Sequence, residues 1–396
     1  MRVIVLLAAM CSLVPAQARE VAVLPFFNLS GSPNLDWIGE SVAETIRRAL
    51  EREGQPVLDR ESREEAYRRL SLRPAAQLAL GSVVKLGRTM ETDAVVYGSF
   101  TVSPAASETA PQGDSRLELT VRILDLREMK QEEPMTAVGQ LQDLGSVQNR
   151  AAWLTLRRLA PENVAVPEEE FQRIHHPVRL DALENYIRGL LASSAEQKHR
   201  LFTQAARLDE SFTEPYFELG RLQYLQANYA VAAGWLERVS AESANVAEAI
   251  FLLGLCRYAM ADYEKAENAF RTVSGLSPSP EVWNNLGAAQ SRLGKAEASD
   301  SFRRAMEAAP YDPVYRFNLG YALWKTAKFE AAAEVIRSLL DLTPQDSQAI
   351  LLLGRCLNQT PASGVAMKME NFERIKADLP RGRLFRMRRE AAAGPG

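Results

Sequence analysis

The 396-residue sequence has a globular composition, with 46% hydrophobic and 24% charged residues, and its length allows two or three domains. The formal net charge of −3 at pH 7 leaves no broad basic field of the kind that non-specific nucleic-acid binding needs. Composition therefore excludes a generally disordered chain and predicts no nucleic-acid partner.

The amino terminus has the features of a cleaved secretory signal. Met1-Arg2 precedes an apolar run over residues 3–14, and Pro15-Ala-Gln-Ala18 supplies a cleavage site of the A-x-A kind. The run is too short to span a bilayer, which takes about 20 apolar residues. We expect residues 1–18 to be removed and the mature protein to be periplasmic or secreted. An outer-membrane lipoprotein anchored through Cys11 is the alternative, and no later stretch of the sequence predicts a transmembrane segment.

Residues 19–160 alternate between strand and helix patterns. Residues 117, 119, 121 and 123 are apolar and alternate with polar residues, which is typical of a sheet with one wet face. The expected strands are 21–27, 56–58, 94–102, 116–126 and 135–140, and the expected helices are 34–52, 62–70, 75–88 and 144–159. This order predicts a small mixed sheet covered by helices, an α/β domain.

Three carboxylates, Asp36, Glu40 and Glu44, recur on one face of the helix expected over residues 34–52. Paired carboxylates can carry acid and base chemistry, but no His or Lys pattern accompanies these, so we expect a solvated helix face. The sequence contains no G-x-S-x-G, H-E-x-x-H, C-x-x-C or P-loop motif. We therefore predict no catalytic residue and no cofactor, and a protein that is not an enzyme.

Histidine and cysteine are sparse. His175-His176 lies in a proline-containing and acidic stretch, residues 161–180, that we expect to be a linker, and it has no partner at a metal-ligand spacing. No metal site is predicted. Cys256 and Cys356 lie three repeat periods apart, too far for a disulfide, and are expected to be core residues.

The second half of the chain has a fixed period. Gly220, Gly254, Gly287, Gly320 and Gly354 are separated by 34, 33, 33 and 34 residues, and each follows a leucine. A period in this range predicts stacked helical hairpins, with glycine where the two antiparallel helices of a hairpin cross closely. Downstream of three of these glycines, a small residue is followed four positions later by a large apolar one: Leu236, Phe270 and Ile336.

This pattern resembles the tetratricopeptide repeat over about residues 181–360. The resemblance implies an α-α superhelix whose first helices line a concave groove. We expect a solenoid over residues 181–376, with about five repeats and a closing helix pair whose second helix spans 362–376. Residues 377–396 are expected to be a basic, disordered tail that could touch an anionic surface.

The resemblance also assigns groove positions within each repeat. They fall on Phe217, Arg221, Tyr224, Phe251, Leu255, Tyr258, Asn284, Arg292, Phe317, Tyr321, Trp324 and Lys325, with Ala288 and Ser291 at the remaining positions. Such an aromatic groove with a few cations suits an apolar peptide or helix; packing between repeats is the alternative for any single aromatic residue. Of the carboxylate clamp found in the chaperone-binding subgroup, only Asn285 and Asn318 fit, so no clamp is expected.

A second resemblance concerns the α/β domain. The runs Val21–Gly31, Leu35–Glu40, Val57–Ser62 and Asp93–Phe100 are similar to the envelope domains related to the amino-terminal domain of TolB and to FlgO, over about residues 20–140. This resemblance implies a role in envelope assembly or regulation and assigns no functional residue.

The sequence thus favours an exported, non-enzymatic adaptor or scaffold of the bacterial envelope that binds a partner protein in its repeat groove. Two alternatives stay open: a structural envelope protein that assembles with itself, and an enzyme with an unrecognised site between the domains.

Overall fold

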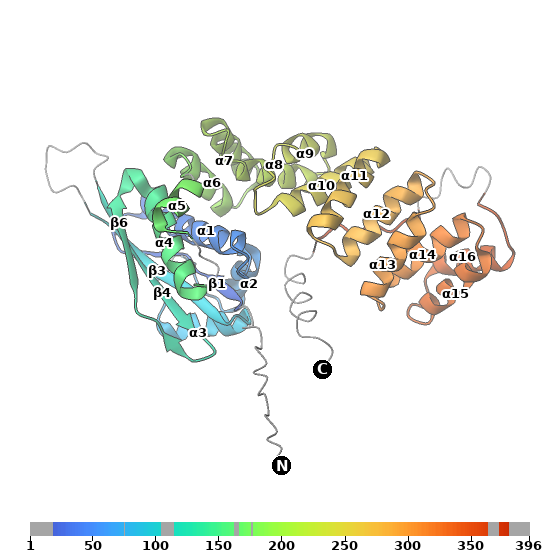
Figure 1. Cartoon of the computed structure of the whole chain (residues 1–396), viewed down its shortest axis with the longest axis horizontal. Helices are drawn as coiled ribbons and strands as arrows, with labels where there is room; N and C mark the ends of the chain where they lie inside the picture. Colours follow the sequence, from blue (N-terminus) through green and yellow to red (C-terminus); the bar gives the residue numbers. More distant parts are fainter. Residues whose placement is uncertain are drawn as a thin grey trace, which may run out of the picture. The chain divides into compact units, whose positions relative to one another are not determined.

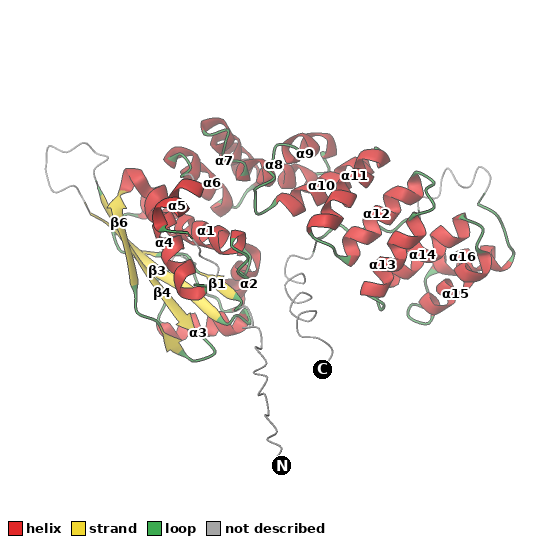
Figure 2. Ribbon diagram, in the orientation of Figure 1, coloured by secondary structure: helices red, strands yellow, loops and turns green. Residues whose placement is uncertain are grey.

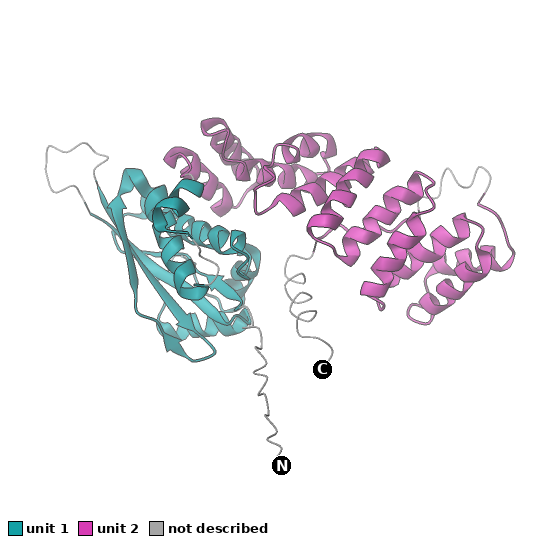
Figure 3. Cartoon of the chain, viewed as in Figure 1, with its two compact units in different colours: residues 1–175, 385–396 teal, residues 176–384 magenta. Residues whose placement is uncertain are grey.

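The computed structural model describes residues 19–74, 76–103, 115–161, 166–175, 177–362 and 372–379. The chain divides into two compact units after His175 (Figure 3). The first contains the described residues up to 175 and the second those from 177 onward. The expected signal peptide and most of the expected basic tail lie outside the described residues.

The first unit is a mixed sheet with helices packed on it (Figure 2). Its strands are β1 (Val21–Val23), β2 (Phe27–Asn28), β3 (Ala94–Ser103), β4 (Arg116–Asp125), β5 (Lys130–Gln131) and β6 (Met135–Gln140). β1 and β2 both run parallel to β3, whereas β4 is antiparallel to β3, β5 and β6. The predicted small mixed sheet is confirmed.

Alternation along β4 follows the prediction. Leu117 and Leu119 are fully buried, while Glu118 between them is exposed. The run expected as one strand over residues 21–27 is divided into β1 and β2, because Pro25 has no N–H to continue a ladder. The strand expected at residues 56–58 is reduced to a single bridge from Val57 to Val21.

The helices of the first unit are α1 (Trp37–Arg52), preceded by η1 (Pro33–Leu35), α2 (Arg60–Arg69), α3 (Leu80–Thr89), η2 (Leu141–Asp143), α4 (Leu144–Leu159) and α5 (Glu168–Ile174). α5 corrects the prediction of a linker over residues 161–180. Its Phe171 is buried and it packs on α4. The Glu168–Glu170 run, read as a linker feature, forms the first turn of this helix, where negative charge favours the helix dipole.

Five helical hairpins and one further helix make up the helices described in the second unit (Figure 1). The hairpins are α6 (Leu180–Leu191) with α7 (Ala195–Leu208), α8 (Glu214–Leu225) with α9 (Tyr229–Leu236), α10 (Val246–Ala259) with α11 (Tyr263–Leu276), α12 (Pro280–Arg292) with α13 (Ala298–Ala308), and α14 (Pro313–Lys325) with α15 (Phe329–Leu340); α16 (Ser347–Leu357) follows. No helix within the described ranges is long and apolar enough to cross a bilayer.

Four of the ladder glycines, Gly220, Gly254, Gly287 and Gly320, mark the crossing point of a hairpin, whereas no described atom lies within 4 Å of a Cβ atom placed at Gly354. A Cβ atom at Gly254 would lie 2.7 Å from the ring of Phe270 on the second helix, and one at Gly320 would lie 2.5 Å from Ile336. Phe270 and Ile336 are completely buried. Each large side chain therefore fills the space that the missing glycine side chain leaves, as the sequence period predicted.

The closing helix expected over residues 362–376 is not formed in its described part. Residues 372–379 are neither helix nor strand, and residues 363–371 lie outside the described residues. The expected boundary of a disordered tail at residue 377 is also wrong, because Leu379 packs against the core cluster of α10 and α12. We call residues 372–379 the 372–379 segment.

We predict opposite effects of alanine at two helical glycines. Gly254→Ala forces a methyl group against Phe270 and should lower the free energy of unfolding by about 1–2 kcal/mol. The control is Gly234→Ala in α9, where no described atom lies within 4 Å; better helix propensity should raise stability by up to about 1 kcal/mol. Urea unfolding of both variants measures this, and equal effects would contradict the close crossing.

Candidate functional site

The face formed by the first helices α10, α12 and α14 carries the 372–379 segment; we call it the first-helix face. Two asparagines hold the main chain of the segment. Asn318 Nδ2 donates to the Arg374 carbonyl at 2.8 Å, and its Oδ1 accepts from the Arg374 N–H at 2.9 Å. Asn285 makes the same pair of bonds with Lys376, at 2.8 and 2.9 Å.

This geometry indicates an extended segment. A side-chain amide presents one donor and one acceptor side by side, so it can pair with the N–H and C=O of a single residue. Arg374 and Lys376 are two residues apart, which is the spacing at which an extended chain presents its polar groups to the same side. Asn285 and Asn318 each lie two residues before a ladder glycine, so the helical repeat places them in equivalent positions.

A third asparagine completes this set. Asn284 Nδ2 also donates to the Arg374 carbonyl at 2.8 Å, while its Oδ1 accepts from Asn318 Nδ2 at 2.7 Å. All three asparagines are completely buried. Buried amides cost stability unless they are hydrogen-bonded, and here the segment supplies most of the partners.

Glu373, the acidic side chain of the segment, lies beside two cationic side chains of the first-helix face. Glu373 Oε1 accepts from the Ser291 hydroxyl at 2.7 Å, Lys325 Nζ lies 3.4 Å from the same oxygen, and Arg292 Nε lies 3.0 Å from Oε2. The Glu373 side chain is 1% exposed. Burial and the Arg292 charge lower the pKa of Lys325 below its ordinary value, although Glu373 opposes them.

Apolar side chains of the segment meet the aromatic residues that the sequence placed in the groove. The Phe372 ring stands edge-on to Tyr321, with centroids 5.8 Å apart, and to Phe317 at 6.5 Å. Ile375 packs against the cores of both neighbouring repeats. Trp324, also predicted, is 4% exposed and its Nε1 donates to the Thr360 carbonyl at 2.8 Å.

The two basic side chains of the segment form outer ion pairs. Arg374 lies over the Phe317 ring at 3.7 Å and pairs with Asp346 at 2.8 Å. Lys376 pairs with Asp312 at 2.6 Å. Arg374 and Lys376 remain partly exposed, so these pairs contribute less than a buried ion pair would.

The predicted groove residues thus divide into two groups. Direct contacts to the segment come from Asn284, Ser291, Arg292, Phe317, Tyr321 and Lys325. Other predicted groove residues pack elsewhere or lie beside these. Phe217 and Leu255 are core residues, and Tyr224 is half-buried. Tyr258 accepts a hydrogen bond from Arg292, and Arg221 lies 3.6 Å from Glu218.

Phe251 illustrates the packing alternative. It is completely buried and stands edge-on to Phe270, with ring centroids 5.8 Å apart. The sequence missed Asn285 and Asn318 as main-chain holders, because they were tested only as parts of a carboxylate clamp. Their shared place two residues before a ladder glycine was the signal that could have found them.

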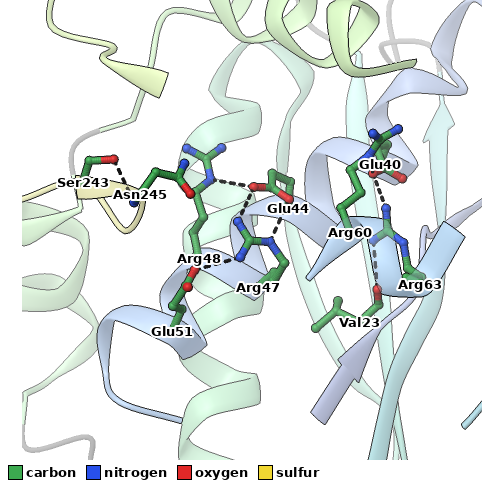
Figure 4. A network of polar contacts seen from close by, with 10 residues as sticks. All are labelled: Val23, Glu40, Glu44, Arg47, Arg48, Glu51, Arg60, Arg63, Ser243 and Asn245. Carbon is green, nitrogen blue, oxygen red and sulfur yellow. Dashed lines mark hydrogen bonds and ion pairs between the residues drawn. The ribbon is translucent and has the colours of Figure 1, made fainter. Parts of the chain in front are cut away.

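The first unit contains a second polar cluster, shown in Figure 4. Glu40 pairs with Arg63 and, at 2.9 Å, with Arg60, and Arg63 also donates to the Val23 carbonyl at 3.0 Å. Glu44 lies 2.7 Å from Arg47.

These pairs correct the expectation of a solvated carboxylate face. Glu40 and Glu44 are each 4% exposed, whereas Asp36 is exposed as expected. Burial acts to raise the pKa of Glu44, but the arginines outweigh it and hold the value at about 2. Glu44 is therefore ionised near neutral pH, and this cluster is suited to holding α1 and α2 in place rather than to proton transfer.

The described cysteines are buried, and the histidine at position 175 is partly buried. Cys256 and Cys356 are buried free thiols, and burial raises the pKa of each to about 11. Burial and the neighbouring Arg52 lower the pKa of His175 to about 4. Within the described ranges, no group of three or more His, Cys, Asp or Glu residues is arranged to hold a metal ion.

The tetratricopeptide repeat family model matches residues 251–313 and 317–368, so this part of the chain carries tetratricopeptide repeats. Solved structures similar to the chain include YrrB, described as a TPR protein with an unusual peptide-binding site (18% identity, TM-score 0.36, 40% of this chain and 82% of that one), and MamA from Desulfovibrio magneticus RS-1 (21%, 0.39, 43% and 99%). No curated protein matches the chain. The resemblance of residues 20–140 to TolB and FlgO domains is not tested by these matches and stays a prediction.

The Glu44 cluster predicts acid sensitivity of the first unit. Because the folded pKa of about 2 lies below the ordinary 4.5, the ion pairs contribute fully above about pH 4.5 and lose their effect as pH falls toward 2, a change on the order of 3 kcal/mol. Glu44→Gln should be clearly less stable than wild type at pH 7, and the gap should narrow between pH 5 and pH 2. Thermal melts across this range test it; a gap that does not change with pH would contradict the assignment.

Proposed function

We propose that the chain is an exported, non-enzymatic scaffold of the bacterial envelope, and that its repeats bind an extended peptide of a partner protein on the first-helix face. The observation that carries the binding mode is the double hold of Asn285 and Asn318 on the main chain of the 372–379 segment. Main-chain hydrogen bonds do not depend on the side chains of the bound peptide.

The chemistry of the face supports a protein ligand over a small molecule. Contacts to the segment run from Phe372 to Leu379 and alternate between aromatic, charged and amide groups. A peptide can meet all of them at once along its length, and buried aromatic and arginine contacts supply most of the binding energy in such interfaces.

Export and the envelope setting rest on sequence. Residues 1–18 have the composition of a secretory signal, and residues 20–140 resemble envelope domains of the TolB and FlgO kind. In this proposal the first unit docks to a second envelope component, while the repeats capture the partner. Basic residues 381–389 would add a contact to an anionic surface.

Photocrosslinking in the native host tests the partner site. A photoreactive residue at Tyr258, beside Arg292 on the first-helix face, should give a discrete adduct with another protein. The control position is Tyr311, which is 83% exposed in the turn before α14. Asn318→Leu should reduce the Tyr258 adduct at least about tenfold, since it removes the main-chain hold. Equal adducts from both positions, or no effect of Asn318→Leu, would count against this face.

Amino-terminal sequencing tests export. Protein purified from the periplasmic fraction should begin at Arg19, after removal of residues 1–18. A diacylated Cys11 at the amino terminus would instead identify a lipoprotein. An intact Met1 in protein confined to the cytoplasm would refute export.

A further inference from the structure

The 372–379 segment shows which side chains the first-helix face selects. Two residues, Arg374 and Lys376, are held by their main chain, and their side chains form partly exposed outer pairs. The side chains that pack into the repeat array are Phe372, Glu373, Ile375 and, at the end of the segment, Leu379. Three of these four lie within the first four positions of the segment, where we place its selectivity.

The position of Glu373 places the strictest requirement on the side chain that binds there. Lys325 and Arg292 are both partly buried, with side chains 18% and 15% exposed, and both face Glu373. Lys325 Nζ also donates to the Ser291 carbonyl at 2.7 Å, which fixes its position. Without an acidic side chain, the two cations would lie together in a partly desolvated site with no negative charge to offset their repulsion. A peptide without a carboxylate at this position should therefore bind poorly.

The other two positions require apolar groups of different shape. Phe372 lies edge-on to two rings, an arrangement that an aromatic side chain meets better than an aliphatic one. Ile375 lies against the cores of both neighbouring repeats, where an aliphatic side chain fills the space. We expect residues 374 and 376 to tolerate substitution better, because their buried hydrogen bonds come from the main chain and their ion pairs are partly exposed.

The described residues of the segment, 372–379, belong to no helix or strand. Its main-chain hydrogen bonds at 374 and 376 are made with side-chain amides of α12 and α14. Another extended peptide can accept and donate the same bonds, so exchange would leave no buried amide unpaired. A covalently attached segment competes at an effective concentration in the millimolar range, which a free peptide has to overcome.

We propose that the 372–379 segment is a built-in competitor for the partner site, and that the partner peptide is extended and carries an aromatic residue, an acidic residue, any residue and an aliphatic residue in succession. This inference rests on the proposed function and specifies its ligand. The partner gains access by displacing the segment, so the free protein is held in a self-inhibited state.

The test uses the full chain and a fluorescent peptide of sequence Phe-Glu-Arg-Ile-Lys-Ala-Asp-Leu, the sequence of the segment. The release variant carries Phe372→Ala and Glu373→Gln, which weaken the tethered competitor and leave the face unchanged. Fluorescence anisotropy should show binding to the release variant at least about tenfold tighter than to wild type. Equal affinity for both proteins, or no binding to either, would overturn the proposal.

Selectivity is measured with matched peptides on the release variant. Replacing the peptide glutamate by glutamine should weaken binding about tenfold or more, whereas replacing its arginine by alanine should change it little. Adding Lys325→Ala to the release variant should reduce the preference for glutamate over glutamine, as expected for a direct pair. Equal binding of the glutamate and glutamine peptides to the release variant would refute the acidic position.

A measurement on wild type guards against unfolding of the release variant. Excess unlabelled peptide should speed hydrogen exchange of the segment's own amides, including those of Arg374 and Lys376, while exchange in α12 and α14 stays slow. Unchanged exchange would make the segment a fixed part of the fold. A concentration-dependent dimer that Asn318→Leu abolishes would assign the face to a second copy of the chain and overturn the partner proposal.

The two proposals fail separately. Tight, glutamate-dependent peptide binding without any Tyr258 adduct in the host would retain the competitor and refute the cellular role. A partner adduct lost in Asn318→Leu, together with equal peptide affinity of wild type and the release variant, would retain the scaffold and refute self-inhibition.

Discussion

The described hairpins of the repeat array depend on the close approach of their two helices at a glycine. Because Gly254 and Gly320 have no side chain, Phe270 and Ile336 can pack directly on the opposite helix. Repetition of this crossing brings equivalent positions of α12 and α14 to one face. That regularity places Asn285 and Asn318 so that they hold residues two apart in a single extended chain.

Two kinds of interaction hold the segment on this face. The asparagine amides fix the path of its main chain through hydrogen bonds, and Arg292 and Lys325 hold the Glu373 carboxylate through charge. The segment runs against the order of the repeats, since Arg374 is held by α14 and Lys376 by the earlier α12. The first unit uses buried charge differently: Glu40 is enclosed by arginines of α2, which stabilises the packing of its helices.

Patterns that repeat locally were predictable from the sequence. The glycine period predicted the helical hairpins, and the alternation of apolar residues around Leu119 predicted β4. Prediction from the sequence failed for contacts between residues that lie far apart along the chain. Asn284 bonds to a residue 90 positions later, and no local pattern could have linked Glu373 to Lys325 or shown that the region after α16 would lie on α12 and α14. The solvated face expected for Glu40 failed for the same reason, because its arginines come from another helix.

The position two residues before each ladder glycine decides where the main chain of the segment can be held. It is occupied by Glu218, Leu252, Asn285, Asn318 and Leu352 in successive repeats. Successive repeats with asparagine there hold the main chain of the segment two residues apart, at Arg374 and Lys376. Leucine occupies this position in the repeats on either side of the two asparagines, so the side-chain hydrogen bonds to the main chain end after two repeats. The number of consecutive repeats with asparagine at this position therefore sets how much of the segment's main chain is held by side-chain amides.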